Sequence, residues 1–211
     1  MDLIVYLSEG AERLPLKKGT TMKKSVLETE FTYTPNQFYT QIQPGLWMSG
    51  TADDDTIFES DRSKCLNSSD QFGSVVTLYS HANPVPWNIQ EMRYGFPDRH
   101  IQNIDLIRLG DVVLWAYKNW QSGNQVLIRC QAGLNRSGLV TALVLMYLGA
   151  TAKEAIMWIR KRRSSDALNN NNYVAWLLKY GARYIQMLKD QERGIKLELT
   201  YLSELLMAVS Y

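Results

Sequence analysis

Cys130 and Arg136 carry two groups that together can act on a phosphate, and only five residues separate them. A cysteine thiolate is a strong nucleophile, and the planar guanidinium of arginine binds two oxygens of a tetrahedral oxyanion. Gly133, between them, lets the backbone adopt conformations closed to other residues and approach an anion closely. Ser137 follows Arg136 and can donate a hydrogen bond to the sulfur, which helps it leave in a second step. The pattern predicts nucleophilic attack by Cys130 on phosphorus.

The residues on either side of this loop predict the elements that hold it. The sequence QVLIR before Cys130 is typical of a buried strand, and the apolar run 137–148 is typical of a helix that Gly149 ends. In open α/β sheets, ligands bind beyond the carboxyl ends of the strands. There, inward-turned backbone N–H groups and a helix dipole together form an anion site. The same field favours the thiolate form of Cys130.

The rest of the chain predicts the remaining elements of an α/β domain. Further strands are expected at 41–51, as a pair around Pro44-Gly45, at 74–80 and, more weakly, at 92–98. Helices are expected from about Leu109, after the capping box Thr151–Glu154, and after the Asn-rich loop at 169–172. Residues 51–73 predict a helix followed by a polar loop. This alternation predicts a central, mainly parallel, twisted sheet flanked by helices on both faces.

Composition narrows the function classes. The 211 residues are 45% hydrophobic and 21% charged, as in a soluble globular protein. A net charge of +2 is too small to require a nucleic-acid or anionic-membrane partner. Cys65 and Cys130, the two cysteines, cannot form a disulfide framework, and two histidines without clustered ligands argue against a structural zinc site. We expect no metal and no cofactor.

The chain divides into three expected regions. These are an N-terminal extension (1–37), a catalytic domain (38–188) and a leucine-rich helical tail (189–211). The start, MDLIVYLSEG, lacks the basic segment and the apolar length of a signal peptide, and the longest apolar run, 139–152, is too short to span a bilayer. We therefore expect a cytoplasmic protein without membrane contact. The sequence leaves its oligomeric state open.

The Cys-x5-Arg-Ser pattern resembles the signature of the cysteine-based protein tyrosine phosphatases, and its surroundings resemble their dual-specificity branch. The likeness covers roughly residues 40–188. IQPGLWMSGTADD looks like the opening strands of that branch, SVVTLYS like its central strand, and RSSDALNNNNYVAWL like its late helix end, Asn turn and following helix. The resemblance implies a protein tyrosine phosphatase-like fold, with Cys130 as nucleophile, Arg136 as phosphate clamp and Ser137 as assistant in phosphoenzyme breakdown. The implied phosphate cradle consists of Gln131, Ala132, Gly133, Leu134, Asn135 and Arg136.

Cleavage of a phosphate ester also needs an acid for the leaving oxygen and a base for the attacking water. Asp98, in YGFPDRH, lies 32 residues (130 − 98) before Cys130 and resembles the family's general-acid loop in spacing and in its Pro-Asp pair. Asp105 and Asp111 are alternatives, although Asp105 can simply cap the helix that follows it. One residue departs from the family pattern: Arg129 stands where histidine is usual. Its fixed positive charge alone would favour the thiolate.

The resemblance implies a phosphatase that hydrolyses phosphotyrosine, and also phosphoserine and phosphothreonine, through a cysteinyl-phosphate intermediate. Its partner would be a phosphorylated protein. An RNA 5′-triphosphatase is an alternative, because Asn135 before Arg136 also occurs in family members that act on RNA ends. A phosphoinositide phosphatase is less favoured, because residues 131–135 contain no lysine. The non-enzymatic alternative is a catalytically weak, phosphate-binding pseudophosphatase, which Arg129 leaves open.

Overall fold

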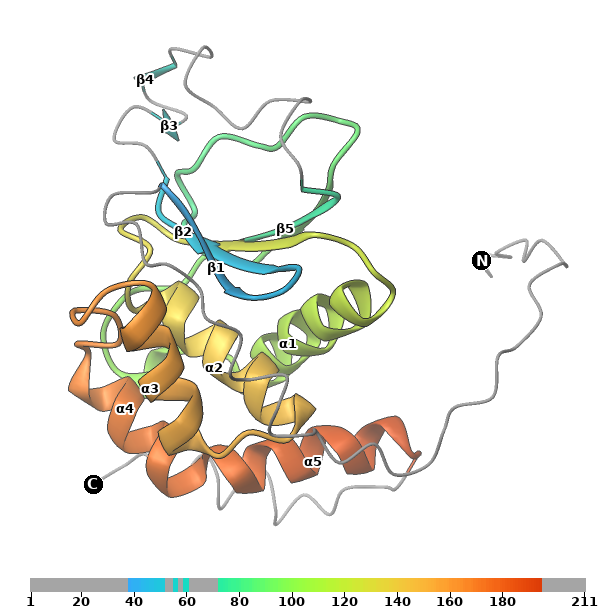
Figure 1. Cartoon of the computed structure of the whole chain (residues 1–211), viewed down its shortest axis with the longest axis vertical. Coiled ribbons are helices and arrows are strands. Elements are labelled where there is room, and N and C mark those ends of the chain that lie inside the picture. The colour runs from blue at the N-terminus through green and yellow to red at the C-terminus, as the bar shows by residue number, and fades with distance from the viewer. Residues whose placement is uncertain (1–37, 52–54, 57–58, 61–71, 195–211) are drawn as a thin grey trace, which may run out of the picture. The chain divides into compact units, whose positions relative to one another are not determined.

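The computed structural model describes residues 38–51, 55–56, 59–60 and 72–194 (Figure 1). The N-terminal extension, Cys65 and most of the leucine-rich tail lie outside the described residues, so the statements made about them above stay predictions. No helix in the described ranges combines the length and the apolar character needed to cross a membrane.

A five-stranded sheet with the strand order β1-β2-β7-β5-β6 forms the centre of the fold. Its strands are β1 (Tyr39–Gln43), β2 (Leu46–Ser49), β5 (Ser74–Thr77), β6 (Gln90–Arg93) and β7 (Val126–Arg129). β1 and β2 form an antiparallel hairpin around Pro44-Gly45, whereas β2 and β7, β7 and β5, and β5 and β6 pair in parallel. The predicted mainly parallel α/β fold is therefore confirmed.

The helices gather on one side of the sheet (Figure 1). They are a short 3-10 helix η3 (Ile101–Asn103), α1 (Leu106–Gln121), α2 (Arg136–Leu148), α3 (Ala152–Arg162), α4 (Asn171–Trp176), the π-helical turn η4 (Leu177–Gly181) and α5 (Ala182–Glu192). Two of them, η3 and α1, precede β7 in the chain. α5 runs past residue 188, where we placed the end of the domain. Near its end, Glu192 pairs with Lys118 of α1 at 2.6 Å, and Tyr147 of α2 donates a hydrogen bond to the same carboxylate.

Strand alternation gives the sheet two different faces. One face, here called the helix face, carries Met48, Val76 and Ile128, which are fully buried in one large core with the helices. The opposite face carries Val75 and Leu127, which pack in a smaller cluster with Phe72 and Ile89 and with partly buried side chains such as Trp47. No described helix belongs to this second cluster.

Three sequence predictions need correction. The expectation of helices on both faces is wrong for the described residues, whose helices all pack on the helix face. The helix expected within 51–73 is wrong where the structure describes this segment, because β3 (Asp55–Thr56) and β4 (Glu59–Ser60) form a short antiparallel pair instead. Ile57 and Phe58 are the only large apolar residues between positions 51 and 62, so the segment has no apolar stripe at helical spacing, and its Asp, Thr and Ser residues favour turns. The first long helix begins at Leu106 rather than Leu109, because Asp105 caps it.

Candidate active site

Cys130 follows β7 directly and lies where the sheet meets α2. Its backbone N–H donates to the Ser49 carbonyl of β2 at 3.3 Å, and Thr51 N–H donates to the Gln131 carbonyl at 2.9 Å. The side chain is only 2% exposed, and its Sγ lies 3.3 Å from Ser137 Oγ in the first turn of α2. The strand end therefore fixes the sulfur, and a hydroxyl able to donate to it stands beside it.

Gly133 shapes the loop between Cys130 and α2. Its φ is +70°, in the left-handed region that glycine favours. A Cβ at this position would lie 2.3 Å from Gly50 N and 2.4 Å from the Ser49 carbonyl carbon. The Gly133 carbonyl in turn accepts a hydrogen bond from Arg163 Nε at 3.1 Å. Both the backbone conformation and the close packing against the end of β2 therefore require glycine.

We predict that Gly133→Ala weakens binding of tungstate, a tetrahedral oxyanion, by at least about tenfold, because a loop displaced by an ångström misaligns its N–H donors. The strain should also lower stability by about 1–3 kcal/mol. Gly123→Ala is the matched control, since Gly123 also has a positive φ (+93°) but a Cβ there would meet nothing within 4 Å. Isothermal titration calorimetry should show weakened tungstate binding for Gly133→Ala and near wild-type binding for Gly123→Ala. Equal tungstate affinities in both variants would contradict this account of the loop.

Arg136 opens α2 and is 8% exposed. Its Nη1 donates to the carbonyls of Leu78 and Phe96, both at 3.3 Å, and its Nη2 donates to Gln131 Oε1 at 3.4 Å. The Nε–H is buried and has no hydrogen-bond partner among the described residues. Because buried donors in proteins are nearly always paired, this N–H is available to bind an oxyanion.

Asp98 lies in the loop after β6, and two asparagine side chains orient its carboxylate. Asn135 Nδ2 donates to Asp98 Oδ2 at 3.0 Å, and Asn170 Nδ2 donates to Oδ1 at 2.8 Å. Tyr173 OH donates to the Pro97 carbonyl at 3.0 Å, and burial raises the pKa of Tyr173, so this hydroxyl stays a donor. The loop that carries Asp98 is therefore tied to the loop 131–135 through Asn135 and to the start of α4 through Asn170 and Tyr173.

The two alternative acids have other surroundings. Asp105 is the N-cap of α1, where its Oδ1 accepts hydrogen bonds from Ile107 N–H at 2.9 Å and Arg108 N–H at 3.2 Å. Asp111 lies on an exposed position of α1. Neither lines the cleft that contains Asp98, so the structure groups Asp98 alone of the three with Arg136.

A cleft of about 440 Å³ contains both Asp98 and Arg136. It is lined by Tyr79, Ser80, His81, Gly95, Phe96, Pro97, Asp98, Gln131 and Arg136. The Arg136 guanidinium lies 5.3 Å from the centre of the Tyr79 ring, within range of a cation–π interaction. The Tyr79 ring also meets the His81 ring edge-on at 5.4 Å. The wall after β5 therefore offers aromatic surface beside the guanidinium.

Arg129 faces away from the thiol. Cys130 belongs to the core on the helix face, whereas Arg129 is in register with Thr77 on the opposite face. Its Nη2 lies 3.5 Å from Glu91 Oε1, and its side chain is 2% exposed. The positive charge that we expected to favour the thiolate is thus paired with a carboxylate on the other side of the sheet.

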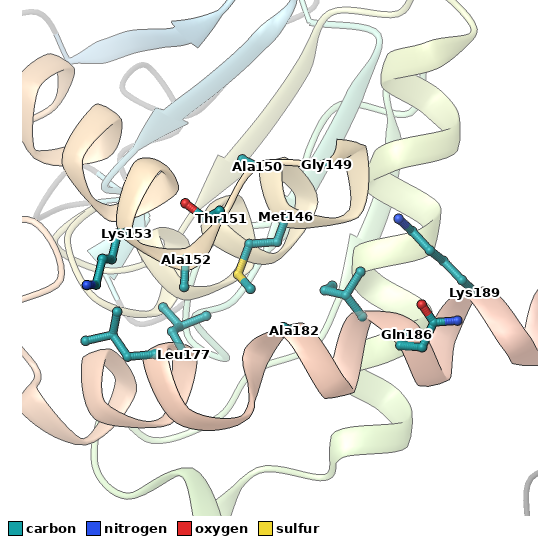
Figure 2. Close-up of a pocket in the computed structure, with 12 residues that line it drawn as sticks. Met146, Gly149, Ala150, Thr151, Ala152, Lys153, Leu177, Ala182, Gln186 and Lys189 are labelled. Atoms are coloured by element: carbon teal, nitrogen blue, oxygen red, sulfur yellow. The ribbon is translucent and has the colours of Figure 1, made fainter. Parts of the chain in front are cut away.

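A second pocket, of about 470 Å³, lies at the other end of α2 (Figure 2). Met146, Leu177 and Ala182 contribute apolar surface, and Lys153 and Lys189 lie at its sides (Figure 2). Because α2 rises about 1.5 Å per residue over its 13 residues, this pocket lies roughly 18 Å from the catalytic loop. It is separate from the cleft that holds Asp98.

Sequence reasoning missed two groups that the structure brings to the site, Tyr79 and Asn170, and it missed Glu91, which pairs with Arg129 on the opposite face of the sheet. Asn170 belongs to the run of four asparagines, but its contact with Asp98 spans 72 positions of sequence. No local pattern marks such a contact. Tyr79 and Glu91 read as ordinary residues of strand ends.

Known proteins resemble this chain in sequence and in fold. The family model described as "Dual specificity phosphatase, catalytic domain" matches residues 60–183, more than half of the chain. An Arabidopsis thaliana protein, "Phosphatidylinositol 3,4,5-trisphosphate 3-phosphatase and protein-tyrosine-phosphatase PTEN1", is 26% identical over 117 residues, which cover 54% of this chain and 28% of the relative. The chain therefore spans less than a third of the length of that relative.

Two solved structures share the arrangement of the elements. DUSP15 superposes with a TM-score of 0.56 and 17% identity, covering 76% of this chain and 97% of that structure. Human DUSP28 superposes with a TM-score of 0.53 and 18% identity, covering 72% and 99%. At these identities the structural likeness shows the fold alone.

Proposed function

This chain belongs to the dual specificity phosphatase family, and from that premise we propose that it hydrolyses phosphomonoesters of tyrosine, and of serine and threonine, in phosphorylated proteins. One observation carries the proposal. The buried Cys130 and the buried Arg136, with its unpartnered Nε–H, lie at the two ends of the loop that follows β7. Arg136 and the oriented Asp98 carboxylate line the same cleft. A nucleophile, an oxyanion clamp and an acid are the three parts that the reaction needs.

In the first step the Cys130 thiolate attacks phosphorus in line with the leaving oxygen. The S–P bond forms as the P–O bond breaks, and Asp98 gives its proton to the departing alkoxide or phenoxide. Arg136 and the N–H groups of the loop hold the three remaining oxygens, whose charge shifts in the transition state. The products are a free alcohol or phenol and a cysteinyl-phosphate.

In the second step Asp98, now a carboxylate, takes a proton from water, and the water oxygen attacks phosphorus. The S–P bond breaks, and inorganic phosphate leaves. Ser137 Oγ, 3.3 Å from the sulfur, donates a hydrogen bond that stabilises the departing thiolate. One aspartate thus acts as acid and then as base.

The substrate class is the open part of this proposal, and a turnover assay tests it. Wild-type protein would be given a phosphotyrosine peptide, a phosphothreonine peptide, a 5′-triphosphorylated RNA and phosphatidylinositol 3,4,5-trisphosphate, the substrate that the Arabidopsis relative's name gives. We expect turnover of the two peptides. The cradle residues 131–135 contain no lysine for the extra phosphates of an inositol lipid. Turnover of the RNA alone, or of the lipid alone, would overturn the protein-phosphatase proposal. We also propose that the phosphoprotein substrates are cytoplasmic.

We predict that Arg136→Lys lowers kcat/KM by about 10²-fold or more, the effect of removing one preorganised donor from an oxyanion site. Lysine keeps the charge but loses the planar fork that can hold two phosphate oxygens while bonded to the Leu78 and Phe96 carbonyls. Competitive inhibition by vanadate should weaken in parallel. Steady-state kinetics on 4-nitrophenyl phosphate would measure both, and a fully active Arg136→Lys enzyme would show that the loop is not the phosphate site.

A further inference from the structure

Four side chains form a polar cluster on the sheet face opposite the helices, here called the Arg129 cluster: Thr77, Glu91, Arg93 and Arg129. Register places Arg129, Thr77 and Arg93 side by side across β7, β5 and β6. Glu91 Oε1 is the shared acceptor, at 2.6 Å from Thr77 Oγ1, 2.9 Å from Arg93 Nη1 and 3.5 Å from Arg129 Nη2. Arg129 Nε also donates to Thr77 Oγ1 at 2.9 Å.

The two arginines of the cluster hold the loop that follows β5. Arg129 Nη2 donates to the Asn83 carbonyl. Arg93 Nη2 donates to the Ala82 carbonyl at 2.7 Å and lies 3.5 Å from the Ser80 carbonyl. The loop adds a single short turn of its own, from Ala82 N–H to the Tyr79 carbonyl at 3.2 Å. Most of its backbone acceptors are thus bound by guanidinium groups that enter from the sheet.

This same loop forms one wall of the cleft. Tyr79, Ser80 and His81 all line it. The carbonyl of Leu78, at the start of the loop, accepts from Arg136 Nη1, and the Tyr79 ring lies beside the same guanidinium. A shift of the loop would therefore move both the wall that meets the substrate and the acceptors that orient the phosphate clamp.

We propose that Arg129 is a positioning residue that holds the 79–83 wall and, through it, the orientation of Arg136. The inference rests on the proposed phosphatase function of the cleft. Arg129 and Cys130 are neighbours in an extended strand and point to opposite faces of the sheet, so the guanidinium acts through the loop and not on the sulfur. Its ion pair is with Glu91, at 3.5 Å, a carboxylate that Arg93 shares. Arg129 contributes the planar, forked geometry of its guanidinium, which contacts three separate acceptors at once. These acceptors belong to Thr77, Glu91 and Asn83.

Two substitutions of Arg129 distinguish the effect of its guanidinium geometry from the effect of its positive charge. Arg129→Lys keeps the charge but cannot reach three acceptors, and Arg129→Met removes both. Both would be made in a Cys65→Ser background, which leaves Cys130 as the only cysteine. The measurements are kcat and KM on a phosphotyrosine peptide, tungstate affinity by calorimetry, and the pH profile of Cys130 alkylation by iodoacetate.

We expect both variants to raise KM and weaken tungstate binding by about tenfold or more, because small misplacements of binding groups have large effects. The value of kcat should fall as well, because Arg136 also holds the phosphate oxygens in the transition state. The alkylation profile should match that of the parent, because Cys130 keeps its own contacts. Two results would overturn the proposal. If Arg129→Lys behaves like the parent while Arg129→Met is impaired, the charge is what matters. If the alkylation profile shifts while KM and tungstate affinity hold, Arg129 acts on the thiol.

Arg93→Met keeps the test decisive if a substitution at the buried Arg129 prevents folding, which thermal unfolding would reveal. The Arg93 side chain is 33% exposed, so its removal is better tolerated, yet it binds the same loop. Its KM and tungstate dissociation constant should rise in the same sense, by a smaller factor. A parental KM and tungstate affinity for Arg93→Met would overturn the proposal that the two arginines hold the 79–83 wall in place. Tungstate binding needs no turnover, so a wild type that binds tungstate but hydrolyses no phosphoester would refute the proposed function while the positioning test could still be read.

Discussion

Cys130→Ser is expected to lower kcat by roughly 10⁴-fold or more, as removal of a covalent nucleophile does. A hydroxyl has nearly the shape of the thiol but is a far weaker nucleophile at neutral pH, because it stays protonated. Tungstate or vanadate affinity should change little, since the binding groups are the loop N–H donors and Arg136. Single-turnover kinetics with a phosphotyrosine peptide and calorimetry with tungstate would measure the two quantities on one preparation.

The combination matters more than the loss itself. A misfolded variant would lose both turnover and oxyanion binding, whereas a variant that lacks only the nucleophile loses turnover alone. Acid quenching of the wild-type reaction with a ³²P-labelled substrate should trap label on the protein, and Cys130→Ser should trap none. Retained hydrolysis by purified Cys130→Ser protein would refute the covalent mechanism.

The strand, loop and helix around Cys130 could be predicted from the sequence because the information for them is local. Cys130, Gly133 and Arg136 lie within seven consecutive residues, and the strand before them and the helix after them are marked by their own apolar patterns. A strand end, a tight turn and a helix start follow one another there, and contacts from the end of β2 and from Arg163 then hold the loop. The parallel sheet follows from the same alternation of strands and helices.

The parts that sequence reasoning missed depend on partners far along the chain. The carboxylate of Asp98 is oriented by Asn135 and Asn170, which lie 37 and 72 positions away. The direction of Arg129 follows from its register with Thr77 and from Glu91, none of which a local pattern fixes. The helix expected within 51–73 fails for a different reason: local propensity there is weak in both directions, so a short strand pair could form instead.

Asp98→Asn should lower kcat by roughly 10²–10⁴-fold, the usual contribution of a positioned general acid. The loss should depend on the leaving group. The threonine alkoxide and phenoxide are strongly basic leaving groups and need the proton. The 4-nitrophenolate leaving group is a weak base and needs it much less. KM should change far less than kcat, because the loop and Arg136 still bind the phosphate. A plot of log kcat against leaving-group basicity should therefore be steeper for Asp98→Asn than for wild type.

Asp105→Asn is the matched control, since it makes the same chemical change in a carboxylate seven residues away. Asn is as good an N-cap as Asp, so the hydrogen bonds to Ile107 and Arg108 N–H should persist, and both stability and rate should stay near wild type. If Asp105→Asn showed the leaving-group-dependent loss and Asp98→Asn did not, the acid would be Asp105, and the cleft between Tyr79 and Asp98 would not be where the ester bond breaks. If neither did, protonation by a side chain would not limit the reaction. A substrate whose leaving group is a weak base, such as the RNA 5′-diphosphate that departs when a 5′-triphosphate gives up its terminal phosphoryl group, would then fit the site better than a phosphoprotein.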